Sequence, residues 1–247
     1  LPQTFQDAIE IAGWFEINWL WIDCLCIIQD SREDWLHEAG MMSQIYQNAQ
    51  LNISADIGAD SRASCFTERD ENNITPLQIS CPQLSQTWKI IPVAWYLFGW
   101  VSRATSISRA WIHRERQLAR RVLHFTNNEI VWECCGVKST AFASEMLPVG
   151  APFEEGLFNM DHKYQIGRLQ QGLVEGDEET YAPWNDVCEN LSEKDLTKPS
   201  NMPMVLSGLA KDFANVLPGD NFIAGLWRST LPQSLTLEHE DLQGPRS

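Results

Sequence analysis

The chain has 247 residues, of which 44% are apolar, and this is enough to bury one or two hydrophobic cores. Its 33 acidic and 18 basic side chains give a formal net charge of −15, which repels phosphate backbones and argues against a nucleic-acid partner. No apolar run in the sequence approaches the roughly 18 to 20 residues of a membrane span, and the first residues lack the pattern of a signal peptide.

The first predicted elements are a helix and a strand. Residues 4–15 carry apolar side chains at helical spacing, with Thr4 in the position of an N-cap. Residues 19–28, WLWIDCLCII, form a continuous apolar run, which is typical of a central strand covered on both faces. Asp23 would then lie toward the carboxyl end of that strand, where open α/β sheets usually bind ligands.

A second helix and a second strand follow at once. Residues 31–49 return to helical spacing, and Ser31 with Asp34 matches the capping-box pattern. Residues 51–57 resume as a strand. Because helices alternate with buried strands, the sequence predicts an α/β fold with a mainly parallel sheet flanked by helices.

The middle of the chain is less regular. Residues 58–88 turn polar and predict a long irregular excursion, whereas residues 88–101 are apolar but contain an Ile-Pro pair that confines them to an edge strand or a loop. Residues 109–121 begin with a short basic helix. Residues 121–125 and 129–135 then predict a β-hairpin.

The last part of the chain predicts mostly helices. Residues 136–180 are acidic and loop-rich, while residues 184–199 and 202–220 have helical spacing and end at proline or glycine stops. We interpret residues 1–135 as one domain and residues 136–247 as a helical C-terminal extension that packs on the same core.

The cysteines indicate an intracellular, cytoplasmic protein, because seven of them occur without repeated C-x-x-C spacing, unlike a secreted disulfide framework. Zinc held by Cys24, Cys26, Cys134 and a histidine is a weaker alternative than buried reduced thiols, so the sequence predicts no metal. A cysteine hydrolase that pairs Cys26 or Cys134 with His113 or His124 is weaker still, since cysteines in apolar strands are usually inert.

Three stretches together resemble one family, the fungal heterokaryon-incompatibility (HET) domain proteins. Residues 1–55 are similar to the family's L-W-I-D-x-L-C-I-x-Q-D block, its D-W-x-x-E helix and its I-Y-x-x-A turn. Residues 108–134 resemble its second block, R-x-W-x-x-Q-E-x-x-L-x-x-R-x-L-x-F followed by W-E-C, and the tail is similar to the extension that often follows. The family's upstream strand, Y-x-x-L-S-Y-x-W-G, is absent, so we expect a missing N-terminal segment. Arg114 stands where the family usually has Gln, while Glu115 is retained.

The resemblance implies a role in self/non-self recognition, in which fused fungal cells of unlike genotype die. The family also looks distantly like TIR domains, which have a flavodoxin-like sheet, and several TIR domains cleave NAD with one glutamate in a W-C-x-x-E pattern. Glu38 follows Trp35 at the same offset and is the implied catalytic residue. The alternative for Glu38 is a solvated residue in the first turns of a helix, where the dipole favours negative charge.

In that hypothesis NAD is a substrate and no cofactor is needed. Asp23 would hold the ribose hydroxyls, a tryptophan would stack on a ring, and arginines would meet the pyrophosphate. Each residue also has a plainer interpretation. Asp23 would be a buried acid with its hydrogen bonds satisfied, the tryptophans would be core residues among the 11 of the chain, and the arginines would form a solvated basic helix face. The predicted ligand-binding residues are Asp23, Trp35, Arg109, Trp111, Arg114, Glu115 and Arg116.

A different class of function stays open. The chain could be a non-catalytic signalling module that acts by self-association or by recruiting an unidentified protein partner, which requires an exposed apolar surface instead of a ligand site. A third and weaker alternative is reuse of the fold as a small-molecule enzyme in secondary metabolism.

Overall fold

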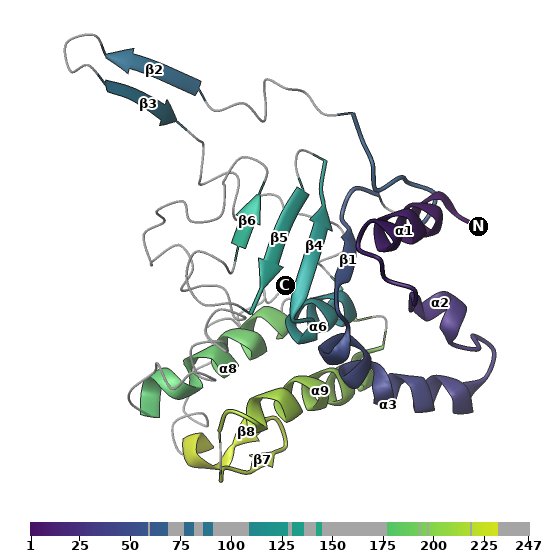
Figure 1. Ribbon diagram of the computed structural model, residues 1–247. Helices are drawn as coiled ribbons and strands as arrows, with labels where there is room; N and C mark the ends of the chain where they lie inside the picture. Colours follow the sequence, from purple (N-terminus) through teal and green to yellow (C-terminus); the bar gives the residue numbers. More distant parts are fainter. Residues whose placement is uncertain are drawn as a thin grey trace, which may run out of the picture.

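The computed structural model describes residues 1–58, 60–68, 77–81, 86–90, 109–127, 130–135, 142–144, 177–192, 194–196, 198–217 and 219–231. These residues form a mixed α/β fold with helices on both faces of a small sheet (Figure 1). None of the helices in these ranges is long and apolar enough to cross a membrane.

The central sheet has four strands in the order β1-β4-β5-β6. Strand β1 (Asn52–Ala55) runs parallel to β4 (Arg121–Phe125), whereas β5 (Ile130–Cys134) is antiparallel to both β4 and β6 (Phe142–Ser144). The predicted hairpin is therefore confirmed, but the prediction of a mainly parallel sheet is wrong for this sheet. The physical reason is the short β4–β5 connection, which can only join antiparallel neighbours. The likeness to TIR and flavodoxin sheets stays a prediction.

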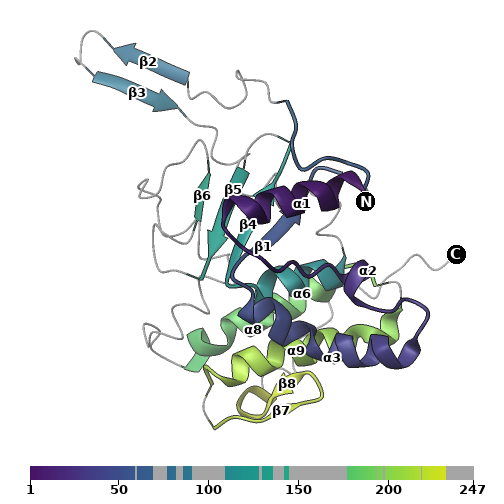
Figure 2. The same ribbon diagram turned by 45° about the vertical axis from the view of Figure 1, so that its right-hand side comes forward.

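Helix α1 (Gln3–Trp14) covers one face of the sheet, as Figure 2 shows. Its Ile11 is fully buried and packs with Phe125 of β4 and with Cys65. The predicted helix is confirmed, but Thr4 is not its N-cap: Pro2 occupies that position, and the Thr4 hydroxyl donates to the Ala63 carbonyl at 2.6 Å.

The prediction of a central strand over residues 19–28 is wrong. The segment instead contains one turn of helix, α2 (Asp23–Cys26), in which the Ile22 carbonyl accepts hydrogen bonds from the amides of Leu25 and Cys26. Trp19 is 89% exposed and Leu25 is 56% exposed. An apolar run becomes a strand only when a neighbouring strand pairs its backbone groups, and here local bonds pair them.

Helix α3 (Arg32–Asn48) follows, and the predicted helix and cap are confirmed. The Ser31 hydroxyl accepts a hydrogen bond from the Asp34 amide at 3.2 Å, while the Asp34 carboxylate accepts from the Ile28 amide at 2.8 Å. The first bond satisfies a backbone donor in the first turn of the helix, and the second ties the segment before the cap to that turn.

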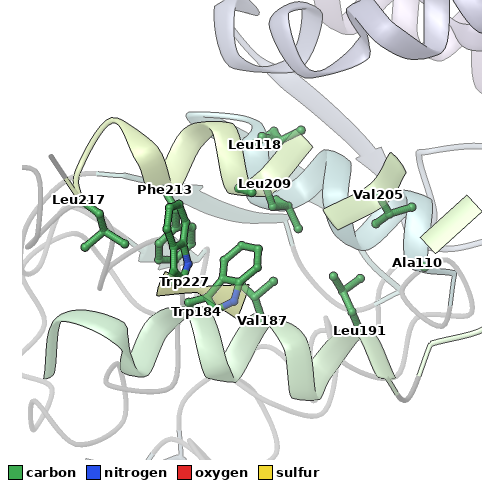
Figure 3. Packing of buried hydrophobic residues seen from close by; sticks show 11 residues of the cluster. Ala110, Leu118, Trp184, Val187, Leu191, Val205, Leu209, Phe213, Leu217 and Trp227 are labelled. Carbon is green, nitrogen blue, oxygen red and sulfur yellow. The ribbon is translucent and has the colours of Figure 1, made fainter. Parts of the chain in front are cut away.

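The opposite face of the sheet is covered by α6 (Ala110–Leu118), which packs against α8 (Asp177–Ser192) and α9 (Met202–Ala214). Figure 3 shows the cluster they share, in which Trp184 and Trp227 lie between α8 and α9. The Trp184 ring is 5.2 Å from the Phe213 ring and 5.7 Å from the Trp227 ring, centroid to centroid. The C-terminal helices thus dock on α6, and the domain boundary at residue 135 stays a prediction.

The remaining elements are short. A hairpin of β2 (Leu77–Cys81) and β3 (Gln86–Ile90) stands apart from the central sheet in Figures 1 and 2, so residues 58–88 are less irregular than predicted. Most of the predicted loop at 136–180 and the apolar residues 91–101 lie outside the described residues. The other short elements are η3 (Pro199–Asn201), β7 (Phe222–Ile223), β8 (Leu226–Trp227) and η4 (Arg228–Thr230).

Candidate functional site

Charged and phenolic side chains from α2, α3 and α6 interact at one place, here called the α2–α3–α6 site. It consists of Asp23 on α2, Tyr46 on α3, and Arg109, Arg114 and Glu115 on or beside α6. Two segments far apart in the sequence, the first block and the second block of motifs, thus come together in space.

Glu115 is the central group of the site. Burial raises the pKa of this carboxyl to about 7, a hydrogen bond from the Tyr46 hydroxyl opposes the rise, and the negative charge of Asp23 adds to it. Arg114 and Arg109 lower the pKa of Glu115 by smaller amounts. Burial also raises the pKa of the Tyr46 phenol, followed by the charge of Glu115. A carboxyl with a pKa near neutrality can both accept and donate a proton at physiological pH.

Arg114 ties the site to the helices around it. Its side chain is buried, one terminal nitrogen donates to the Ser43 hydroxyl at 2.5 Å, and its guanidinium carbon lies 5.3 Å from the centre of the Trp111 ring. A Cβ atom added at Gly208 of α9 would come within 2.5 Å of this guanidinium. The glycine therefore makes room for Arg114, whose Nε and Nη1 have no hydrogen-bond partner among the described residues.

Aromatic rings line the same junction. Trp35 of α3 meets Trp111 of α6 edge to face at 6.4 Å between ring centres, and Trp21 meets Tyr46 edge to face at 5.8 Å. Trp111 also packs against the core cluster of α8 and α9. Each ring thus has a packing role in the fold, and Trp35 and Trp111 lie together as a stacking site would require.

Asp23 reaches the site in a different way from that predicted. It is the first residue of α2 instead of a strand residue, and its carboxylate accepts a hydrogen bond from the Cys24 amide at 2.6 Å. The side chain is exposed, so the alternative of a satisfied buried acid is wrong. Its charge is felt by both Tyr46 and Glu115.

Glu38 lies on α3, one turn beyond Trp35, and is partly buried. Helical spacing puts it on the flank of α3 away from Ser43, the residue that contacts Arg114. Among the described residues it takes part in no hydrogen bond or ion pair. Its catalytic role stays a prediction.

Arg116 points elsewhere, into a buried charge network between α6 and the sheet. Its Nε is 2.8 Å from the Glu133 carboxylate, which in turn lies 2.9 Å from Nε2 of His124. The other ring nitrogen of His124 lies 2.8 Å from Asp56. Burial lowers the pKa of His124, but the bonds to Asp56 and Glu133 outweigh it and the net shift is upward. Both ring nitrogens therefore donate to carboxylates.

The network removes His124 from the cysteine-hydrolase alternative, because neither ring nitrogen is left for a thiolate. Burial and then the charge of Arg116 lower the pKa of His113 to about 3, so this histidine is neutral. Within the described part of the chain, no group of three or more His, Cys, Asp or Glu side chains is arranged to hold a metal ion.

The comparison with protein families matches residues 1–115 to the family described as Heterokaryon incompatibility protein (HET). Residues 1–115 are therefore similar to a HET domain. All five residues of the α2–α3–α6 site fall within the matched stretch, which ends at Glu115. Neither a curated protein nor a solved structure matches the chain.

Sequence reasoning missed two residues that help to build the α2–α3–α6 site, Tyr46 and Gly208. Tyr46 was visible as the tyrosine of the I-Y-x-x-A pattern, but only the fold shows that its hydroxyl meets Glu115. Gly208 lies 94 positions after Arg114 in the sequence, and no local pattern signals their contact. Of the predicted residues, Arg116 alone is drawn into the buried network with Glu133.

Proposed function

We propose that this HET domain is an effector of self/non-self recognition that triggers cell death by hydrolysing NAD at the α2–α3–α6 site. The observation that supports it best is the convergence of two acidic groups, a phenol and two arginines beside paired tryptophans. These are the groups needed to hold a dinucleotide and to stabilise positive charge on its ribose.

Hydrolysis of NAD requires few protein groups. Breaking the bond between ribose and nicotinamide builds oxocarbenium character on the sugar, and a carboxylate stabilises it while water attacks. Nicotinamide leaves as a neutral molecule, so it needs no proton from the enzyme. The carboxylate in question is either Glu38, from its offset to Trp35, or Glu115, from its place in the site.

The other groups would bind the substrate. Arg109 is exposed at the start of α6 and can meet a phosphate, while Asp23 is exposed and can accept hydrogen bonds from ribose hydroxyls. Arg114 is too deeply buried to reach far and is better placed to hold Trp111 and Ser43 in position.

The test is NAD turnover by the purified protein at high protein concentration, followed by nicotinamide release. Arg109→Ala should raise KM more than it lowers kcat, because it removes a binding contact remote from the reacting bond. The control is Arg62→Ala, an exposed arginine paired with Asp60. If folded wild-type protein releases no nicotinamide, the enzymatic proposal is wrong.

A second function is favoured by a specific observation, the exposed apolar side chains of the N-terminal elements. Trp14 is 55% exposed, Trp19 is 89% exposed and Ile28 is 58% exposed. Exposed apolar side chains of this kind suit a non-catalytic module that works by self-association. Light scattering should then show assembly that depends on concentration and is lost in Trp19→Ser, whereas a monomer at all concentrations would count against it.

A further inference from the structure

Two thiol groups that the proposed function does not use lie close together on α2. Among the cysteines whose side chains the structure describes, only Cys24 and Cys26 are exposed, whereas Cys65 is buried and the others are partly buried. Helix α2 itself lies at the edge of the molecule, away from the central sheet (Figure 1). Reagents in solution can therefore reach both thiols without any opening of the core.

We propose that Cys24 and Cys26 form a redox-active dithiol, which a peroxide oxidises to an intramolecular disulfide and whose oxidation opens α2. A small-molecule thiol reverses the step. This inference goes beyond the proposed function and does not depend on NAD hydrolysis.

The spacing of the two cysteines allows this disulfide but excludes it from an intact helix. Two residues apart on an ideal helix, the Cα atoms lie about 5.4 Å from each other, inside the roughly 4.4 to 6.8 Å range of disulfides. Their side chains, however, leave the helix about 200° apart, so the two sulfur atoms cannot meet while residues 23–26 stay helical. Oxidation must therefore open α2.

Few hydrogen bonds oppose this opening. The Ile22 carbonyl accepts from the amides of Leu25 and Cys26 at 3.0 Å and 2.8 Å. The Asp23 carbonyl accepts from the Ile27 amide at 2.9 Å, and the Asp23 carboxylate accepts from the next amide of the chain at 2.6 Å. Because the segment is exposed, each of these bonds can be exchanged for one to water at little cost. A single exposed turn is thus soft enough for a disulfide to open it.

The surroundings of Cys24 decide which thiol reacts first. Burial raises the pKa of this thiol, the negative charges of Asp23 and of a Cys26 thiolate add to the rise, and a hydrogen bond from the Cys24 amide opposes it. The contribution of Cys26 indicates that the two sulfur atoms lie close enough to interact. A thiol with a raised pKa is a poor nucleophile at neutral pH, so Cys26 attacks the peroxide first.

The reaction has two steps. The Cys26 sulfur bonds to one oxygen of hydrogen peroxide while the oxygen–oxygen bond breaks, which gives a sulfenic acid and one water. The Cys24 sulfur then bonds to the Cys26 sulfur while the sulfur–oxygen bond breaks, and the leaving hydroxide takes the Cys24 proton to become a second water. The two thiols thus lose two electrons and two protons, and the peroxide takes up both.

Such a disulfide is suited to a switch instead of a structural bond. Strained or exposed disulfides are the readily reduced ones, and glutathione would return this one to the dithiol through a mixed disulfide. Helix α2 also carries Asp23 of the α2–α3–α6 site, so its opening would change the position of this carboxylate relative to Tyr46 and Glu115.

The first experiment treats the reduced chain with a small excess of hydrogen peroxide and maps its cysteines by mass spectrometry after alkylation. The peptide with Cys24 and Cys26 should lose two hydrogen atoms and regain them in reduced glutathione. Cys24→Ser should instead leave a sulfenic acid at Cys26, which dimedone traps, and Cys188→Ser is the control that should keep the disulfide. Oxidation of either cysteine to a stable sulfinic acid, a disulfide between two chains, or no reaction would overturn the inference.

A second measurement tests the link to α2. Hydrogen exchange at short labelling times should be at least roughly tenfold faster at the amides of Leu25, Cys26 and Ile27 in the oxidised protein, because their hydrogen bonds within α2 are lost. Cys24→Ser treated with peroxide in the same way should show no change, and thermal unfolding verifies that each variant is folded. A disulfide that forms without faster exchange at these amides would contradict the opening of α2 and with it the proposed switch.

Discussion

The buried network of Asp56, His124, Glu133 and Arg116 makes a sharp prediction for stability. Both carboxylates and the imidazole between them are 1% exposed, and the two ion-pair distances are 2.8 Å and 2.9 Å. His124→Gln would leave two buried carboxylates without the positive charge that they share. Breaking a buried pair usually costs about 3 to 5 kcal/mol, which is a large part of the roughly 5 to 15 kcal/mol that keeps a domain folded.

The assay is urea unfolding followed by tryptophan fluorescence, with the m-value as a check that the unfolded state is unchanged. Arg62→Ala is the control, because its ion pair with Asp60 is as short, at 2.6 Å, but fully exposed and should contribute nothing measurable. Adding Asp56→Asn to His124→Gln should recover about 1 kcal/mol or more, since one uncompensated charge is gone. A loss below about 1 kcal/mol in His124→Gln would refute the reasoning.

The same network fixes the sign of a pH dependence. The folded-state pKa of His124 lies above its ordinary value of 6.5, so the folded protein binds this proton more tightly than the unfolded chain. The stabilisation is fully present below about 6.5 and is lost as pH rises through the folded-state pKa. The destabilisation by His124→Gln should therefore be larger at about pH 6 than at about pH 9.

Three further predictions follow from single positions. Gly208→Ala should destabilise the protein by about 1 to 3 kcal/mol, because the added Cβ would meet the Arg114 guanidinium. Gly40→Ala is the control and should stabilise the helix by roughly 0.5 to 1 kcal/mol, because nothing lies within 4 Å of its added Cβ. Equal effects of the two substitutions in urea unfolding would contradict this packing. Stability should fall as pH rises from about 4.5 to about 7 through ionisation of Glu115, and Glu115→Gln should flatten that slope in thermal scans. Trp184→Ala should lower the free energy of unfolding in urea by about 3 to 5 kcal/mol, because the ring is buried among three other aromatic rings. A decrease below about 1 kcal/mol would count against this core.

Local signals in the sequence determined many of the secondary elements. The helices at Gln3–Trp14, Arg32–Asn48 and Met202–Ala214 follow from apolar spacing that repeats with the helix period, and the Ser31 cap follows from a side chain that bonds three residues ahead. The β4–β5 hairpin follows from two short apolar runs around a tight turn. These features depend on neighbours in the chain, so the sequence alone contains them.

The family and most of the site were also readable from the sequence. The two motif blocks predicted the HET domain, and Asp23, Arg109, Arg114 and Glu115 were expected to act together. The motifs did not reveal which of these side chains would be buried, and the pKa of Glu115 depends on that burial.

Only the tertiary structure decided the rest, because it depends on contacts between distant residues. The apolar run at residues 19–28 becomes an exposed turn and α2 since its backbone bonds locally instead of entering the sheet. Arg116 of α6 pairs with Glu133 of β5, which also contacts His124 of β4, and Tyr46 interacts with Glu115 because α3 packs on α6. The sequence determines which charged side chains are present, and the packing of the helices on the sheet determines which of them are buried next to one another.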